Sequence, residues 1–142
     1  MTTEPRRVIV VDAANVIGSR PDGWWRDRPG AARRLLTNLA ELQHRRQDTT
    51  DIIVILEGAA RAAVSGPEAP DTGTLRVVLA PGSGDDTIVS VTAESTAQPH
   101  TPDVTVVTAD RGLRHRVERT GATPTGPSWL LDQLDRLQPG SS

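Results

Sequence analysis

The stretch "VIVVDAANV", residues 8–16, decides the fold of this 142-residue chain. Four apolar β-branched residues run from Val8 to Val11, and Asp12 follows them directly. An uninterrupted apolar run of this kind is typical of a strand that is buried on both faces of a parallel sheet. A carboxylate at the end of a buried strand is unexpected, so Asp12 is a candidate for a functional or a structural role.

Three further stretches share this pattern, and segments of helical period separate them. The strand-like stretches are "DIIVILEG" (51–58), "TLRVVLAP" (74–81) and "DVTVVTAD" (103–110), and a short fifth strand is expected near 122–125. The helical segments are 29–47, 81–95, 111–121 and 128–137. This alternation predicts a single-domain, three-layer α/β/α fold of Rossmann-like type, with a mostly parallel central sheet of four to five strands.

Local signals predict where the helices begin and end. Gly121 is expected to form the carboxyl-terminal cap of one helix, and Ser128 the amino-terminal cap of the last. Residues 58–73 are predicted to form a loop with at most one helical turn. The helix over 29–47 has Pro29 in its first turn. Its predicted buried face consists of Ala32, Leu35, Leu36, Leu39 and Leu42.

Composition restricts the function. The length fits one domain over 1–142, with an ordered core from about 7 to 137. The absence of cysteine excludes disulfides and thiolate-held metal sites, and the absence of lysine excludes a P-loop. No apolar run approaches the roughly 20 residues of a membrane span, so we expect a cytoplasmic protein. The net charge of −2 gives no overall attraction for nucleic acid.

Acidic residues lie where the predicted strands end. Asp12, Glu57 and Asp110 follow three strands, and Asp85 and Asp86 follow the turn after another. Ligands of open α/β sheets bind outside the carboxyl ends of the strands, so we expect these side chains to gather at one edge. Gathered carboxylates repel one another unless a cation is present, and Mg²⁺ or Mn²⁺ prefers such oxygen ligands. The alternative for each aspartate alone is a strand terminator or a helix cap.

With these residues in place, the chain resembles the PIN-like nuclease superfamily, and most of all its NYN branch. The similarity rests on "VIVVDAANV", "GDDTIVSV" and "VVTADRGL" in this order, and it extends from about residue 8 to 137. It implies a Mg²⁺- or Mn²⁺-dependent ribonuclease of bacterial type. The implied metal ligands are Asp12, Asp85, Asp86 and Asp110, with Asn15 as a companion and Thr108 as a small hydroxyl beside the last aspartate. Glu57 is the best candidate for a fourth acid, followed by Asp22 and Asp27.

Tryptophan and arginine residues follow the first strand. Trp24 and Trp25 lie among Arg20, Arg26 and Arg28, so an indole could stack on an unpaired base while arginines contact phosphates. The alternative is that the two indoles cover the core beside the first helix. Arg111, Arg114 and Arg116 could form a basic rim after Asp110, or an ordinary solvated helix face.

Three functions follow as hypotheses. The first is a metal-dependent ribonuclease with RNA as substrate, a Mg²⁺ or Mn²⁺ cofactor and no membrane contact. The second is a PIN-like module that binds RNA or protein without catalysis. The third is a phosphohydrolase with Asp12 as nucleophile, which the lack of a lysine disfavours. A homodimer and a protein partner stay open as further alternatives.

Overall fold

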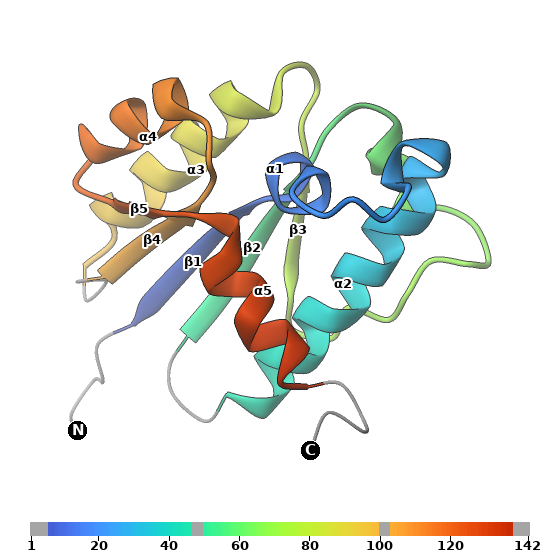
Figure 1. Cartoon of the computed structure of the whole chain (residues 1–142). Coiled ribbons are helices and arrows are strands. Elements are labelled where there is room, and N and C mark those ends of the chain that lie inside the picture. The colour runs from blue at the N-terminus through green and yellow to red at the C-terminus, as the bar shows by residue number, and fades with distance from the viewer. Residues whose placement is uncertain (1–5, 47–49, 100–102, 138–142) are drawn as a thin grey trace.

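The chain folds around a five-stranded parallel sheet (Figure 1). The computed structural model describes residues 6–46, 50–99 and 103–137. The strand order is β3-β2-β1-β4-β5. The strands are β1 (Arg7–Asp12), β2 (Thr50–Leu56), β3 (Arg76–Leu79), β4 (Asp103–Val107) and β5 (Thr123–Thr125). The predicted α/β class and the fifth strand are therefore confirmed.

Helices cover both faces of this sheet. In Figure 1, α3 and α4 lie on one side, and α2 and α5 lie on the other. No helix among the described residues has the length and apolar character needed to cross a membrane. The α-helices are α1 (Ala13–Gly18), α2 (Arg28–Arg45), α3 (Gly84–Ala97), α4 (Arg111–Glu118) and α5 (Pro127–Asp135). Two 3₁₀ helices, η1 (Trp24–Arg26) and η2 (Gly58–Val64), complete the set.

The core has two layers because β1 is buried on both faces. Ile9 and Val11 pack in the layer that contains α2 and α5, whereas Val8 and Val10 pack in the layer that contains α3 and α4. The central position of β1 explains this, since Val11 pairs with a residue of β2 on one side and of β4 on the other. The predicted apolar face of α2 is buried as expected.

The order of the strands creates one reversal point. From β1 the chain moves outward through β2 to β3, and it then returns to the other side of β1 to form β4 and β5. The helices that follow β1 and β4 therefore lie on opposite faces of the sheet. Open α/β sheets bind their ligands between the first residues of two such helices. Here these starts are the residues after Asp12 and those after Val107. We refer to this end of the strands as the carboxyl edge and to the opposite end as the amino edge.

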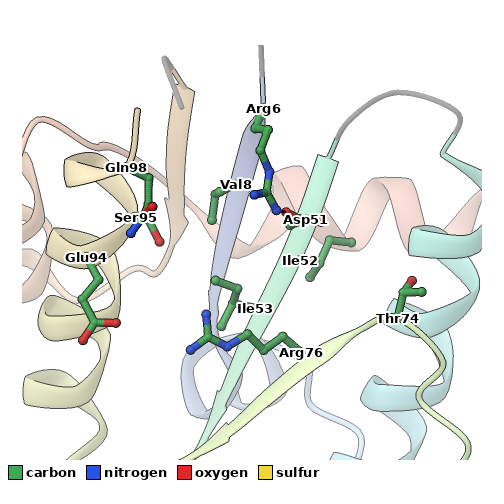
Figure 2. Close-up of a pocket in the computed structure, with 10 residues that line it drawn as sticks. All are labelled: Arg6, Val8, Asp51, Ile52, Ile53, Thr74, Arg76, Glu94, Ser95 and Gln98. Carbon is green, nitrogen blue, oxygen red and sulfur yellow. Dashed lines mark hydrogen bonds and ion pairs between the residues drawn. The ribbon is translucent and has the colours of Figure 1, made fainter. Parts of the chain in front are cut away.

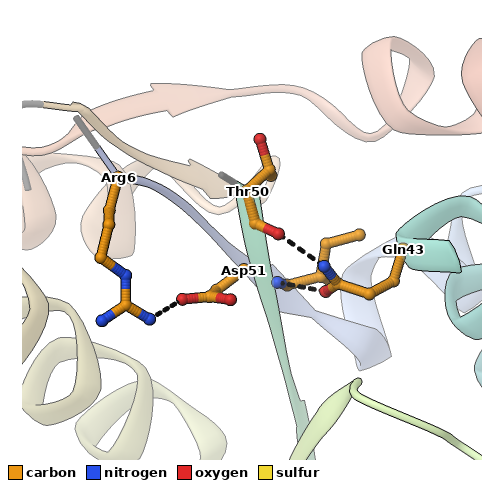
Figure 3. Close-up of polar contacts among 5 residues, drawn as sticks. Arg6, Gln43, Thr50 and Asp51 are labelled. Atoms are coloured by element: carbon orange, nitrogen blue, oxygen red, sulfur yellow. Dashed lines mark hydrogen bonds and ion pairs between the residues drawn. The ribbon is translucent and has the colours of Figure 1, made fainter. Parts of the chain in front are cut away.

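Polar contacts close the amino edge (Figure 3). The carboxamide of Gln43 on α2 donates to the carbonyl of Thr50 and accepts the N–H of Ile52 at 2.8 Å. Arg6 pairs with Asp51 at the start of β2. The Gln43 contacts attach the end of α2 to the beginning of β2, and the Arg6 pair attaches the segment before β1 to the same strand.

Several local predictions were wrong. The strand at 74–81 is not buried on both faces, because β3 is an edge strand and Leu79 is exposed. Ser128 does not begin α5, because Pro127 takes the first helical position and Gly126 the cap. The helix before Gly121 ends earlier, with Arg119 as cap, although Gly121 does adopt a positive φ of 98°.

Two short helices also departed from expectation. Residues 58–64 form a seven-residue 3₁₀ helix, about two turns, where at most one turn was predicted. The six-residue α1 was not predicted at all. It begins immediately after Asp12, and this placement brings Asn15 back toward the end of β1.

Candidate active site

Asp12 lies at the end of β1 and is almost completely buried, with 5% of its surface exposed. Its Oδ1 accepts the backbone N–H of Asn15 at 3.3 Å, which makes Asp12 the amino-terminal cap of α1. Its Oδ2 accepts the hydroxyl of Thr108 at 2.9 Å. The side chain is therefore fixed by both elements that flank the reversal point of the sheet.

Asn15 connects the same two segments through its side chain. Its Nδ2 donates to Asp12 Oδ2 at 3.1 Å, and its Oδ1 accepts the N–H of Ala109 at 3.0 Å. One carboxamide thus joins the turn after β1 to the turn after β4. The predicted companion role of Asn15 has a physical basis in this arrangement, since the amide holds the carboxylate and the neighbouring backbone in one geometry.

Thr108 and Asp110 form the other half of this network. Thr108 is fully buried, and its hydroxyl accepts the N–H of Asp110 at 3.2 Å while it donates to Asp12. Asp110 Oδ1 accepts the N–H of Leu113 at 2.9 Å and so caps α4. Asp12 and Asp110 are both helix caps, as the structural alternative proposed, and both lie at the reversal point.

Glu57 approaches from the end of β2. Its Oε2 accepts the N–H of Gly84, the first residue of α3, at 2.6 Å. A Cβ atom at position 84 would lie 3.0 Å from the Glu57 carboxylate, so a larger residue would push this carboxylate away. Gly84 was not singled out from the sequence, although its place directly before two aspartates was a usable signal.

The structure separates the two neighbouring aspartates of α3. Asp85 interacts electrostatically with Asp12, Glu57 and Asp110, and it is partly buried. Asp86 is exposed and forms an ion pair with Arg116 of α4 at 2.9 Å. Asp85 is therefore the member of the pair that belongs to the carboxylate group, and Asp86 lies on the outer surface.

The candidate carboxylates influence each other's ionisation. Burial raises the pKa of Asp12 above its ordinary value, and the charges of Asp85 and Glu57 raise it further, against the opposing effect of the Thr108 and Asn15 hydrogen bonds. Partial burial also raises the pKa of Asp85, with added repulsion from Asp110 and Glu57. We call Asp12, Glu57, Asp85 and Asp110 the acidic group.

The donor atoms of the acidic group suit a hard divalent cation. They are all carboxylate oxygens, the ligand type that Mg²⁺ and Mn²⁺ prefer, and their mutual repulsion would be relieved by a positive charge. Among the described residues, no three acidic or histidine side chains stand close enough to enclose an ion. Mg²⁺ is commonly held by one or two carboxylates together with water and substrate phosphate, so the donor set fits this cation without a closed protein cage.

A matched pair of variants tests the repulsion at Asp85. Because the folded state raises the Asp85 pKa, ionised Asp85 lowers stability above that pKa, and the cost disappears below the unfolded value of about 4. In metal-free buffer at pH 7, Asp85→Asn should melt about 1–3 °C above Asp86→Asn. Both variants lose the same favourable charge in the first turn of α3, and Asp86→Asn also loses an exposed ion pair with Arg116 that is worth about 0–1 kcal/mol.

Thermal unfolding followed by circular dichroism from pH 4 to 7 measures this difference. The gap between the two variants should be small at pH 4 and should widen as the pH rises. A gap that is constant with pH, or an Asp85→Asn variant that melts below Asp86→Asn at pH 7, would contradict the repulsion.

The two tryptophans occupy different environments. Their rings meet edge to face with centroids 6.1 Å apart. Trp24 is half-buried and has the guanidinium of Arg28 5.5 Å from its ring centroid. Trp25 is 54% exposed, with Arg26 5.8 Å from its ring. The predicted aromatic and basic cluster therefore forms, but only Trp24 faces inward.

Other predicted residues lie outside the acidic group. Arg20 pairs with Asp135 of α5 at 2.7 Å, and with Asp22 it lines a groove that contains none of the four acidic-group residues. Asp27 caps α2 by accepting the N–H of Gly30, so the two alternatives to Glu57 as fourth acid are not brought to the site. Arg111 is exposed at the start of α4.

A cavity at the amino edge provides a contrast (Figure 2). It has a volume of about 370 Å³ and lies beside the first residues of β1, β2 and β3. Two acidic residues line it, Asp51 from β2 and Glu94 from α3, and Asp51 is paired with Arg6. The lining of this cavity therefore has mixed charge, since Arg6 and Arg76 line it together with these two acidic residues.

The similarity of this chain to a known protein is a similarity of fold. No protein-family model matches the sequence, and no curated protein matches it. The structure is similar to a crystal structure of a variant of Rae1 (YacP) from Bacillus subtilis, with a TM-score of 0.71. The two chains are 17% identical, and the similarity covers 92% of this chain and 76% of that chain. By its fold, this chain is therefore a five-stranded parallel α/β protein similar to Rae1.

Proposed function

We propose that the chain is a metal-dependent ribonuclease whose acidic group holds Mg²⁺ or Mn²⁺ at the reversal point of the sheet. The observation that carries the proposal is that Asp85 interacts electrostatically with Asp12, Glu57 and Asp110, so carboxylates from separate segments of the chain lie at one edge of the sheet. The sequence resemblance to PIN-like nucleases supports RNA as the substrate, and the fold shared with Rae1 is compatible with it.

The protein's own contribution is to orient the ligands. Thr108 and Asn15 hold Asp12 so that its carboxylate keeps one direction, and the backbone of Gly84 does the same for Glu57. Hydrogen bonds to a ligating side chain commonly decide how well it binds. Because both oxygens of Asp12 accept hydrogen bonds, a ligand role suits this side chain better than a nucleophile role.

A bound ion would lower the pKa of a water molecule and stabilise the charge that develops on the phosphoryl oxygens. We expect Arg111, which is exposed at the start of α4 and pairs with no carboxylate among the described residues, to contact a phosphate of the strand. The chain has no lysine, so such contacts would all be made by arginine.

Calorimetric titration of Mn²⁺ tests the metal site without a choice of substrate. The wild-type chain should bind Mn²⁺ saturably, and Asp12→Asn should lose this binding. The control is Asp103→Asn, because Asp103 lies at the amino edge and pairs with Arg7 at 3.1 Å. Equal binding by all three chains would contradict the site, as would absence of binding by the wild type both with and without RNA.

A further inference from the structure

A cavity of about 320 Å³ adjoins the acidic group. This volume is in the range of small-molecule sites, about 300–1,000 Å³. Its lining residues come from α1, η1, the start of α2, the end of β2 with η2, and the loop before α3. Its lining includes Ala14, Ile17, Trp24, Arg28, Glu57 and Ala60.

Glu57 belongs to both the cavity and the acidic group. It lines the cavity, and its charge acts on Asp12 and Asp85. The two sites are therefore contiguous, and a molecule bound across them would place one part against the cavity wall and the next part against the carboxylates. An RNA strand has this form, since each phosphate is linked to a flat aromatic base.

The wall of the cavity suits a base. Ala14 and Ile17 provide apolar surface from α1, while Trp24 provides an aromatic ring and Arg28 a planar cation that lies over it. Aromatic rings and guanidinium planes are the two surfaces on which proteins stack unpaired bases. In the described part of the chain, no carboxylate pairs with Arg28, so its charge is free for a phosphate.

We propose that this cavity receives one unpaired base of the RNA, the base beside the phosphate held at the acidic group. The proposal rests on the proposed ribonuclease function and adds which residues of the chain receive a base of the substrate. A base inside a duplex is stacked on both faces and paired along one edge, so it would have to leave the helix to enter the cavity. Trp24 is the stacking residue, and Trp25, which does not line the cavity, is not.

Binding in the presence of a chelator tests the cavity without cleavage. The probe is a fluorescein-labelled oligoribonucleotide, alone or annealed to its complement, and anisotropy reports its Kd for the full chain. Trp24→Ala should weaken single-strand binding about 5- to 100-fold, the range expected for one stacked base. Trp24→Phe keeps an aromatic ring and should stay within about 3-fold of the wild type. The duplex should bind at least about 10-fold more weakly than the single strand to the wild type.

Control variants separate stacking from folding. Trp129→Ala removes an exposed indole from α5 and should leave Kd unchanged. Trp25→Ala should weaken binding less than Trp24→Ala. If Trp24→Ala does not fold, Arg28→Gln tests the cavity in its place, because it removes the stacked cation and leaves the indole in position. Arg28→Gln should weaken binding about 3-fold or more.

The results distinguish this inference from the proposed function. A folded Trp24→Ala chain that binds single strands as the wild type does would overturn the inference, and so would equal affinity for the duplex. RNA binding that depends on Trp24, in a chain that cleaves no RNA with any divalent ion, would support the cavity and overturn the nuclease. Metal-dependent cleavage with an unchanged KM in Trp24→Ala would support the nuclease and overturn the cavity as a base site.

Discussion

Replacement of Asp12 by Asn should slow metal-dependent RNA cleavage at least about 100-fold while the fold is kept. The loss of a residue that only orients a ligand already costs about 10- to 100-fold in metal affinity or activity, so the loss of a ligand should cost no less. Asn is as good a helix cap as Asp, so the substitution preserves the amino-terminal cap of α1. The new amide would also turn an N–H₂ toward Asn15 Nδ2, so assignment of the lost activity to the negative charge needs a second variant.

Single-turnover cleavage of a labelled RNA in Mn²⁺, with a chelator as blank, measures this effect. Asp110→Asn should behave in the same way, because it too keeps its cap on α4 and loses its charge. Asp103→Asn at the amino edge should cleave at the wild-type rate. If Asp12→Asn and Asp110→Asn cleave within a few-fold of the wild-type rate, the two aspartates are only helix caps and the catalytic role is contradicted.

The Thr108→Val variant should be both less stable and a poorer metal binder. The substitution keeps the shape of the side chain but removes a buried hydroxyl that donates to Asp12 and accepts from Asp110. The unpaired N–H of Asp110 and the loss of one of the two hydrogen bonds to Asp12 Oδ2 should lower the free energy of unfolding by about 1–3 kcal/mol. Because Asp12 loses a fixing contact, Mn²⁺ affinity should fall about 10- to 100-fold.

Thr92 offers the same chemical change at a matched position. It is fully buried on α3, and its hydroxyl finds no hydrogen-bond partner among the described residues. Thr92→Val should therefore be neutral or stabilising by up to about 1 kcal/mol, with unchanged Mn²⁺ affinity. Urea denaturation in metal-free buffer and calorimetry compare the two variants. If Thr108→Val and Thr92→Val have equal stability and equal Mn²⁺ affinity, the Thr108 hydroxyl does not help to hold Asp12.

The sheet was predictable because its signal is local. Runs such as residues 52–56 are apolar at every position, as burial on both faces requires, and α2 repeats its apolar residues at helical spacing. In contrast, α1 has only six residues and too few turns for a period to be read. Its formation depends on the cap that Asp12 provides, and this contact became visible only in the structure.

The sequence predicts at which edge of the sheet the candidate site lies, but it does not predict which of the neighbouring residues belong to it. Strand ends placed Asp12 and Asp110 at one edge because parallel strands share a direction. Asp85 and Asp86 are adjacent on a helix, about 100° apart, so no spacing rule chooses between them. The choice is made by Arg116, which comes from another helix and pairs with Asp86. Trp24 and Trp25 are also adjacent, so the sequence alone does not show which of the two indoles faces inward.

The hydrogen bond between Thr108 and Asp12 joins residues that are 96 positions apart. Contacts of such separation form late, because a long segment of chain must be ordered before its ends can meet. A chain made from its amino terminus contains Asp12 long before Thr108 has been added. The acidic group thus requires the chain at least as far as Asp110, and any cleavage that it performs can begin only after that residue has been added.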